Sequence, residues 1–130
     1  INTGVLYGGR DLHGDQKTIQ RKNQIMVCTP GRIIQQINMK HIKVGEVKYL
    51  VYDESDQMFD DGFNKDCAYI KERVSADVQT VLSSATITDK VSNFVEFEIG
   101  VHGVRFPAQE NNHFFAFVGP CDLRKHALFG

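Results

Sequence analysis

The chain has 130 residues, 42% of them hydrophobic and 24% charged, which is typical of one soluble globular domain with a real core. No apolar run approaches the ~20 residues that a membrane-spanning helix needs, so we expect no membrane partner. The three cysteines, Cys28, Cys67 and Cys121, are widely separated and show no spacing typical of zinc ligands. They indicate small buried thiols in a reducing compartment.

The charge is unevenly distributed along the chain, although the net value is only 15 − 16 = −1. Residues 1–43 contain seven Lys/Arg and two Asp/Glu, a net of +5, whereas residues 44–130 contain eight and fourteen, a net of −6. Two interpretations of the basic segment stay open. It could meet a polyanion, or it could be a solvated basic helix around Lys17–Lys22.

Predicted strands and helices alternate along the chain. We expect strands over 3–9, 24–28, 47–53, 79–85 and 113–118, and helices over 14–23, 33–40, 64–74, 89–99 and 121–129. This alternation predicts an α/β fold with a mostly parallel sheet flanked by helices.

Local signals refine this prediction. Asp15 is expected to cap the first helix. The nearly continuous apolar run over 47–53 is expected of a strand whose sheet is covered by helices on both faces. Residues 100–112, with two Gly, a Pro and two Asn, are expected to form a loop or linker.

Four short segments follow predicted strands: Gly8-Gly9, Thr29–Arg32, Asp53–Asp56 and Ser84–Thr86. Ligands of open parallel sheets bind just beyond the carboxyl ends of the strands. We therefore expect all four segments to lie on one edge of the sheet and to form a site there.

The sequence "YLVYDESD", residues 49–56, ends an apolar strand with three carboxylates, whose mutual repulsion is costly unless they are solvated or meet a cation. Asp53 is placed to bind magnesium, a hard cation that takes oxygen ligands and often retains water. Glu54 could then orient or deprotonate a water that attacks a phosphate. An acidic strand end without a ligand is the simpler alternative.

The segment "TPGR", residues 29–32, could start a helix, with Thr29 as its cap and Pro30 in its first turn. The amides at such a helix start attract phosphate, Gly31 allows close approach, and Arg32 adds a charged fork. The alternative, which this segment taken alone favours, is a well-capped helix with a solvated arginine. Ser84 and Thr86 could bond the carboxylates or cap the next helix, and Gly8-Gly9 could be a simple turn.

Taken in order, "YGG", "TPGR", "LVYDESDQMFDDGF" and "QTVLSSAT" resemble the first RecA-like domain of DEAD-box RNA helicases, from about Val5 to Thr86. The resemblance implies a RecA-like P-loop NTPase fold that is incomplete in this chain. Residues 1–107 would be the C-terminal part of the first domain, and residues 108–130 a linker and the start of the second.

The resemblance also implies roles for individual residues, and ATP and Mg²⁺ as cofactors. Asp53 would hold magnesium through water, and Glu54 would be the base for ATP hydrolysis. Asp56 would contact Ser84 and Thr86 and so couple hydrolysis to unwinding. Gly8, Gly9, Thr29, Pro30, Gly31 and Arg32 would hold the RNA sugar-phosphate backbone without reading its sequence.

The chain departs from the family pattern in two places. Ser55 stands where the family usually has Ala, a change expected to have little effect. The phosphate-binding loop G-x-x-x-x-G-K-[ST] is absent from the sequence. Because the chain begins with Ile1 rather than Met, we expect it to be a piece of a longer helicase. Without the phosphate-binding loop it is expected to be inactive alone, and a partial sheet with an exposed edge and apolar face is expected to make it poorly soluble.

The expected function of the full protein is RNA duplex unwinding or ribonucleoprotein remodelling, driven by ATP, inside the cell in cytoplasm or nucleus, with possible protein regulators. The first alternative is a non-catalytic RNA- or protein-binding scaffold that kept the fold. The second is a related NTPase that acts on DNA, which RNA-versus-DNA stimulation of ATPase activity would distinguish.

Overall fold

The computed structural model describes residues 1–98 and 114–118, so the loop expected over 100–112 and the helix expected over 121–129 lie outside the described residues. The chain divides into two compact units, Ile1–Gly45 and Glu46–Gly130, and each is described here by itself. The boundary lies close to the point where the charge of the sequence changes from basic to acidic.

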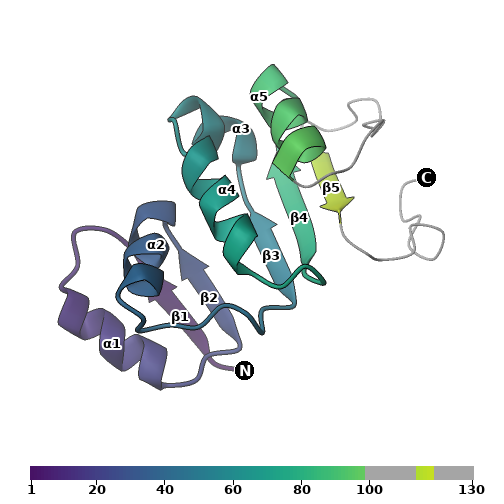
Figure 1. Ribbon diagram of the computed structural model, residues 1–130. Helices are drawn as coiled ribbons and strands as arrows, with labels where there is room; N and C mark the ends of the chain where they lie inside the picture. Colours follow the sequence, from purple (N-terminus) through teal and green to yellow (C-terminus); the bar gives the residue numbers. More distant parts are fainter. Residues whose placement is uncertain (99–113, 119–130) are drawn as a thin grey trace. The chain divides into compact units, whose positions relative to one another are not determined.

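The first unit contains β1 (Thr3–Leu6), α1 (Leu12–Gln20), β2 (Ile25–Cys28) and α2 (Pro30–Asn38), drawn in purple to blue in Figure 1. The two strands pair in parallel, with Val5 opposite Val27. This strand–helix–strand–helix order confirms the elements predicted for the basic part of the sequence.

Helix α1 begins two residues earlier than the sequence predicted. Its N-cap is Asp11, whose carboxylate accepts a hydrogen bond from the backbone N–H of His13 at 3.2 Å. Asp15, which we expected to be the cap, lies inside the helix and is fully buried. That prediction was wrong, because Asp11 caps the helix and the Asp15 carboxylate contacts α2 instead.

The second unit contains strands β3 (Tyr49–Tyr52), β4 (Gln79–Ser84) and β5 (Phe114–Val118). Its helices are α3 (Ser55–Asp60), α4 (Asn64–Arg73) and α5 (Asp89–Asn93), the last continued by a π-helical turn over Phe94–Glu98. In the sheet order β3-β4-β5, β3 and β4 are parallel and β5 is antiparallel to β4 (Figure 1). The domain boundary expected at 107/108 stays a prediction.

Two aromatic contacts hold the core of the second unit together. The ring of Phe94 meets Tyr52 edge-on, with centroids 5.4 Å apart, and lies 4.8 Å from the ring of Phe59. Cys67 and Leu82 complete this buried cluster with Val91 and Val95. Aromatic pairs in such arrangements add to the stability that burial alone provides. The core therefore joins β3 and β4 to the helices that follow them.

One face of β1, β2 and β3 is exposed among the described residues. Tyr49 and Val51 of β3 are 68% and 58% exposed, and Val5, Ile25 and Val27 of the first unit are also exposed. The expectation that helices cover both faces around β3 was therefore wrong for the described residues. The apolar run of the sequence did not distinguish the covered face from the open one.

In the described part of the chain, no helix is long and apolar enough to span a bilayer.

Candidate functional site

The chain turns sharply where β3 ends. Glu54 has left-handed backbone angles, φ +49° and ψ +49°, and its N–H donates a hydrogen bond to the Asp53 carboxylate at 3.0 Å. This conformation costs a residue other than glycine on the order of 1–2 kcal/mol. Strained residues of this kind gather at functional sites. The turn leads directly into α3 and leaves the side chains of Asp53 and Glu54 exposed.

A hollow of about 250 Å³ lies beside this turn. It is lined by Asp53, Glu54, Asp56, Gln57, Ser83, Ser84 and Ala85. Because β3 and β4 are parallel, their carboxyl ends meet at the same edge of the sheet, as the sequence predicted. Gln57 and Ser83 were not among the predicted residues. Gln57 belongs to α3, which the sequence analysis did not predict, and Ser83 directly precedes the predicted Ser84.

Asp56 and Thr86 are joined directly. The Oδ2 atom of Asp56 accepts hydrogen bonds from the Thr86 hydroxyl at 2.8 Å and from the Thr86 backbone N–H at 3.1 Å. The backbone N–H of Asp56 donates to the Ser84 hydroxyl at 3.3 Å. That hydroxyl in turn donates to the Thr86 carbonyl at 2.6 Å. The structure thus brings together the three residues whose contact the sequence predicted.

Ser55 supports the same arrangement from within. Its side chain is fully buried, and its hydroxyl donates to the Ser83 carbonyl at 3.2 Å. Alanine could not make this bond. Ser55 therefore adds a connection between the start of α3 and the end of β4.

The contacts with Thr86 and Ser84 change the acidity of Asp56. Partial burial is the largest single influence and raises its pKa. Hydrogen bonds from Thr86, Ser84 and the backbone N–H of Gln57 favour the charged form and together outweigh burial, so the pKa of Asp56 is lowered from its ordinary value. Asp56 is therefore an ionised hydrogen-bond acceptor at neutral pH.

The anionic donors of the hollow are carboxylates, which can bind a metal ion. Within residues 1–98 and 114–118, no group of three or more His, Cys, Asp or Glu side chains could hold a metal. Magnesium differs from zinc, because it usually retains several waters and uses one or two carboxylates together with substrate phosphates. The exposed carboxylates of Asp53 and Glu54 fit that kind of binding.

In the first unit, the predicted residues lie at the ends of its two strands. The backbone N–H of Thr29 donates to the Leu6 carbonyl at 3.0 Å, which ties the end of β2 to the end of β1. Thr29 occupies the N-cap position of α2 without a side-chain capping bond, and Pro30 is in the first turn. The prediction of a helix start at this segment is confirmed.

The glycines of these segments face open space. A methyl group added at Gly8, Gly9 or Gly31 would meet no atom within 4 Å. Gly9 has a φ of +82°, which a side chain would strain, so the turn itself requires glycine there. At Gly31, packing within the chain gives no reason for glycine. The open space would admit a ligand close to the backbone.

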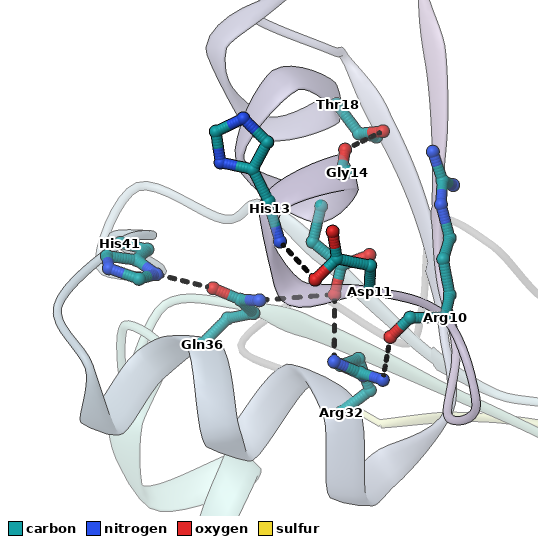
Figure 2. A network of polar contacts seen from close by, with 9 residues as sticks. Arg10, Asp11, His13, Gly14, Thr18, Arg32, Gln36 and His41 are labelled. Atoms are coloured by element: carbon teal, nitrogen blue, oxygen red, sulfur yellow. Dashed lines mark hydrogen bonds and ion pairs between the residues drawn. The ribbon is translucent and has the colours of Figure 1, made fainter.

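Arg32 does not extend outward as the sequence analysis expected. It is only 9% exposed, and its Nη1 atom lies 3.4 Å from Oδ2 of the fully buried Asp15. Its Nη2 atom donates to the Arg10 carbonyl at 2.6 Å. Figure 2 shows the guanidinium directed toward Arg10 within a network of polar contacts.

The expectation that all four strand-end segments share one edge stays a prediction, since each unit is described by itself.

Comparison with known proteins identifies the family. The model of the DEAD/DEAH box helicase family matches residues 1–94. The chain belongs to this family. It is 42% identical over 91 residues to the human "ATP-dependent RNA helicase DDX42", an alignment that covers 70% of this chain and 10% of that protein. It is 36% identical over 111 residues to "ATP-dependent RNA helicase CshA" of Limosilactobacillus reuteri, covering 85% of this chain and 22% of that protein.

Solved structures of DEAD-box proteins share its fold. The DEAD box protein of Methanococcus jannaschii is 33% identical with a TM-score of 0.73, and the match covers 77% of this chain and 27% of that one. The yeast DEAD-box splicing factor Prp28 is 26% identical with a TM-score of 0.70, covering 75% and 23%. These matches confirm the predicted RecA-like α/β fold. The DEAD-box chain described here spans roughly a tenth to a fifth of the length of the curated relatives.

Proposed function

We propose that this chain belongs to an ATP-dependent RNA helicase that couples Mg-ATP binding and hydrolysis to RNA unwinding or ribonucleoprotein remodelling. Family membership supports this proposal, as do relatives whose names describe ATP-dependent RNA helicases. The observation that carries it is the link between Asp56 and Thr86 beside two exposed carboxylates, because this site would supply a metal ligand, a base and a coupling contact for hydrolysis.

The second unit would provide the hydrolytic site. Asp53 would hold magnesium through water, and magnesium would offset the negative charge of the ATP phosphates there. Glu54 would accept the proton of the water that attacks the terminal phosphate. The left-handed turn at Glu54 supports this role, because Glu54 lines the hollow and strained residues of this kind gather at functional sites.

The contact of Asp56 with Ser84 and Thr86 would couple the two activities. It joins the helix that follows the catalytic carboxylates to the segment that follows β4. A change at the phosphate side of the hollow would reach β4 through these bonds. We assign coupling to Asp56, Ser84 and Thr86 on this basis.

The first unit would bind RNA. It carries a net charge of +5 over residues 1–43, and the open spaces at Gly8, Gly9 and Gly31 let a sugar-phosphate backbone approach. The amides at the start of α2, near Thr29 and Pro30, would attract phosphate. Such contacts position RNA without reading its bases.

The remaining assignments are parts of the same proposal. Residues 1–107 would end the first RecA-like domain, and 108–130 would link it to the second. The chain alone would hydrolyse no ATP, because its sequence lacks the phosphate-binding loop. The protein would act in the cytoplasm or nucleus, where regulatory proteins could bind it.

The proposal is tested with the full-length protein by measuring ATP hydrolysis with no nucleic acid, with RNA and with DNA of the same sequence. We expect stimulation by RNA. Equal stimulation by DNA would favour the DNA-directed alternative, because contacts with the 2′-OH distinguish the two. No hydrolysis under any condition would favour the non-catalytic scaffold.

A further inference from the structure

A chain of polar side chains crosses the interior between α1 and α2 (Figure 2). Oδ2 of Asp15 accepts a hydrogen bond from Nε2 of Gln36 at 3.1 Å and faces Nη1 of Arg32 at 3.4 Å. Oε1 of Gln36 lies 2.8 Å from Nδ1 of His41. Asp15 and Gln36 are both fully buried. The network therefore lies in the interior of the unit.

The geometry fixes the direction of these bonds. Gln36 must donate through its amide nitrogen to Asp15, because a carboxylate oxygen can only accept. Its amide oxygen is then the acceptor, so Nδ1 of His41 is the donor. His41 orients Gln36, and Gln36 together with Arg32 holds the Asp15 carboxylate.

The network joins the two segments proposed to hold RNA. Arg32 is the last residue of the segment at the start of α2, and it donates to the carbonyl of Arg10 at 2.6 Å. Arg10 directly follows Gly9. The guanidinium of Arg32 thus connects the turn after β1 to the first turn of α2, and the buried Asp15 carboxylate pairs with that guanidinium.

Burial of the Asp15 carboxylate is energetically costly, so stability alone does not account for this residue. Its Oδ1 atom is buried and has no hydrogen-bond partner among the described residues. A buried ion pair is often no more stabilising than apolar side chains of the same volume. The Asp15–Arg32 ion pair differs from apolar packing because the planar guanidinium fixes the orientation of the groups that it joins.

We propose that Asp15 is a positioning residue for RNA binding, which acts by fixing Arg32 so that the Gly8-Gly9 turn and the start of α2 face the same phosphate backbone. This inference rests on the proposed RNA-binding function of the first unit. Arg32 is then a positioning residue also, rather than a direct phosphate ligand. Gln36, which His41 orients, donates to the same Oδ2 atom of Asp15 that faces Arg32.

The direction in which one substitution changes RNA affinity distinguishes this positioning role from a purely electrostatic effect. Asp15→Asn removes a negative charge near a polyanion, so an electrostatic effect alone would strengthen RNA binding. Loss of positioning would weaken it. Asp11→Asn is a matched control, because it removes the exposed carboxylate of the same helix and asparagine is an equally good N-cap.

Two measurements on the 130-residue chain test the proposal. The first is hydrogen exchange at the Ile33 amide, which is bonded to the Thr29 carbonyl at 3.2 Å in the first turn of α2. The second is the affinity for a short fluorescent oligouridylate over a range of salt concentrations. Wild type, Asp15→Asn, Asp11→Asn and Arg32→Met are compared.

We expect Asp15→Asn to accelerate exchange at Ile33 and to weaken binding about tenfold. Asp11→Asn should do neither. Arg32→Met should weaken binding without changing how steeply the logarithm of the affinity falls with the logarithm of the salt concentration. Loss of a direct phosphate contact would instead reduce that slope by about 0.7. Unchanged exchange in Asp15→Asn, tighter binding by it, or that reduced slope in Arg32→Met would overturn the proposal. If wild type binds no RNA, the proposed function of the unit fails, and exchange at Ile33 still decides whether Asp15 positions α2.

Discussion

One carboxylate oxygen of Asp56 accepts two hydrogen bonds from Thr86, at 2.8 Å from the hydroxyl and at 3.1 Å from the backbone N–H. The two residues are 30 positions apart in sequence. Their contact depends on β3 and β4 lying parallel and ending at the same edge. Both local stability and the proposed coupling depend on this carboxylate being ionised.

The contact predicts an acid-sensitive stability. The pKa of Asp56 is lowered in the folded chain, whereas an unfolded aspartate titrates near a pH of about 3.9. The stabilisation is therefore complete above that pH and is lost as the pH falls through the folded pKa. The thermal midpoint of wild type should fall more steeply with acid than that of Asp56→Asn. Parallel pH dependences of the two proteins would contradict the assignment.

Ser55 should contribute measurably to stability. Its buried hydroxyl donates to the Ser83 carbonyl, and Ser55→Ala leaves that acceptor without this donor. A hydrogen bond of this kind contributes about 0.5–1.5 kcal/mol. Urea unfolding should show a loss of that size, with Ser92→Ala in α5 as the comparison. An equal or greater stability of Ser55→Ala would instead support the expectation from sequence that this position matters little.

The sequence predicted the candidate site better than it predicted local detail. Asp53, Asp56 and Ser84 lie at one edge as expected, because strand ends in a parallel sheet meet there, whereas their roles stay predictions. Helix α3 was missed, since its six residues are too few to show an apolar period. The left-handed turn at Glu54 was also missed, because nothing in the residue type requires it.

The buried pair in the first unit could not be predicted from the sequence. Asp15 and Arg32 belong to different helices, and their pairing depends on how α1 and α2 pack. A local pattern gives an aspartate near a helix start the role of a cap, and gives an arginine after Gly31 the role of a phosphate ligand. Tertiary packing overrode both patterns.

The described thiols should react slowly in the folded chain. Burial raises the pKa of Cys67 to about 12 and that of Cys28 to about 11. Since the thiolate is the reactive form, iodoacetamide at a pH of about 8 should alkylate both slowly until urea is added. Peptide mass spectrometry measures each site separately. Rapid alkylation of Cys67 in the absence of urea would show that the core around Phe59 is not formed.

The exposed apolar face should limit solubility. Tyr49 and Val51 project from β3 with 68% and 58% exposure. Contiguous exposed apolar surface promotes association. Val51→Thr should reduce light scattering by the 130-residue chain at high concentration, since threonine keeps the β-branched shape that suits a strand. The buried control Val91→Thr should destabilise the chain instead. No change in scattering with Val51→Thr would exclude this face as the cause of association.

The central claim is that Glu54 is the base of an RNA-stimulated ATPase. The most direct test measures RNA-stimulated ATP hydrolysis by the full-length protein with Glu54→Gln, and with Glu72→Gln as a matched change on the exposed surface of α4. Loss of a general base typically lowers the rate about 10²–10⁴-fold, so we expect hydrolysis to fall by that factor in Glu54→Gln alone. Unchanged hydrolysis in Glu54→Gln would contradict the catalytic assignment.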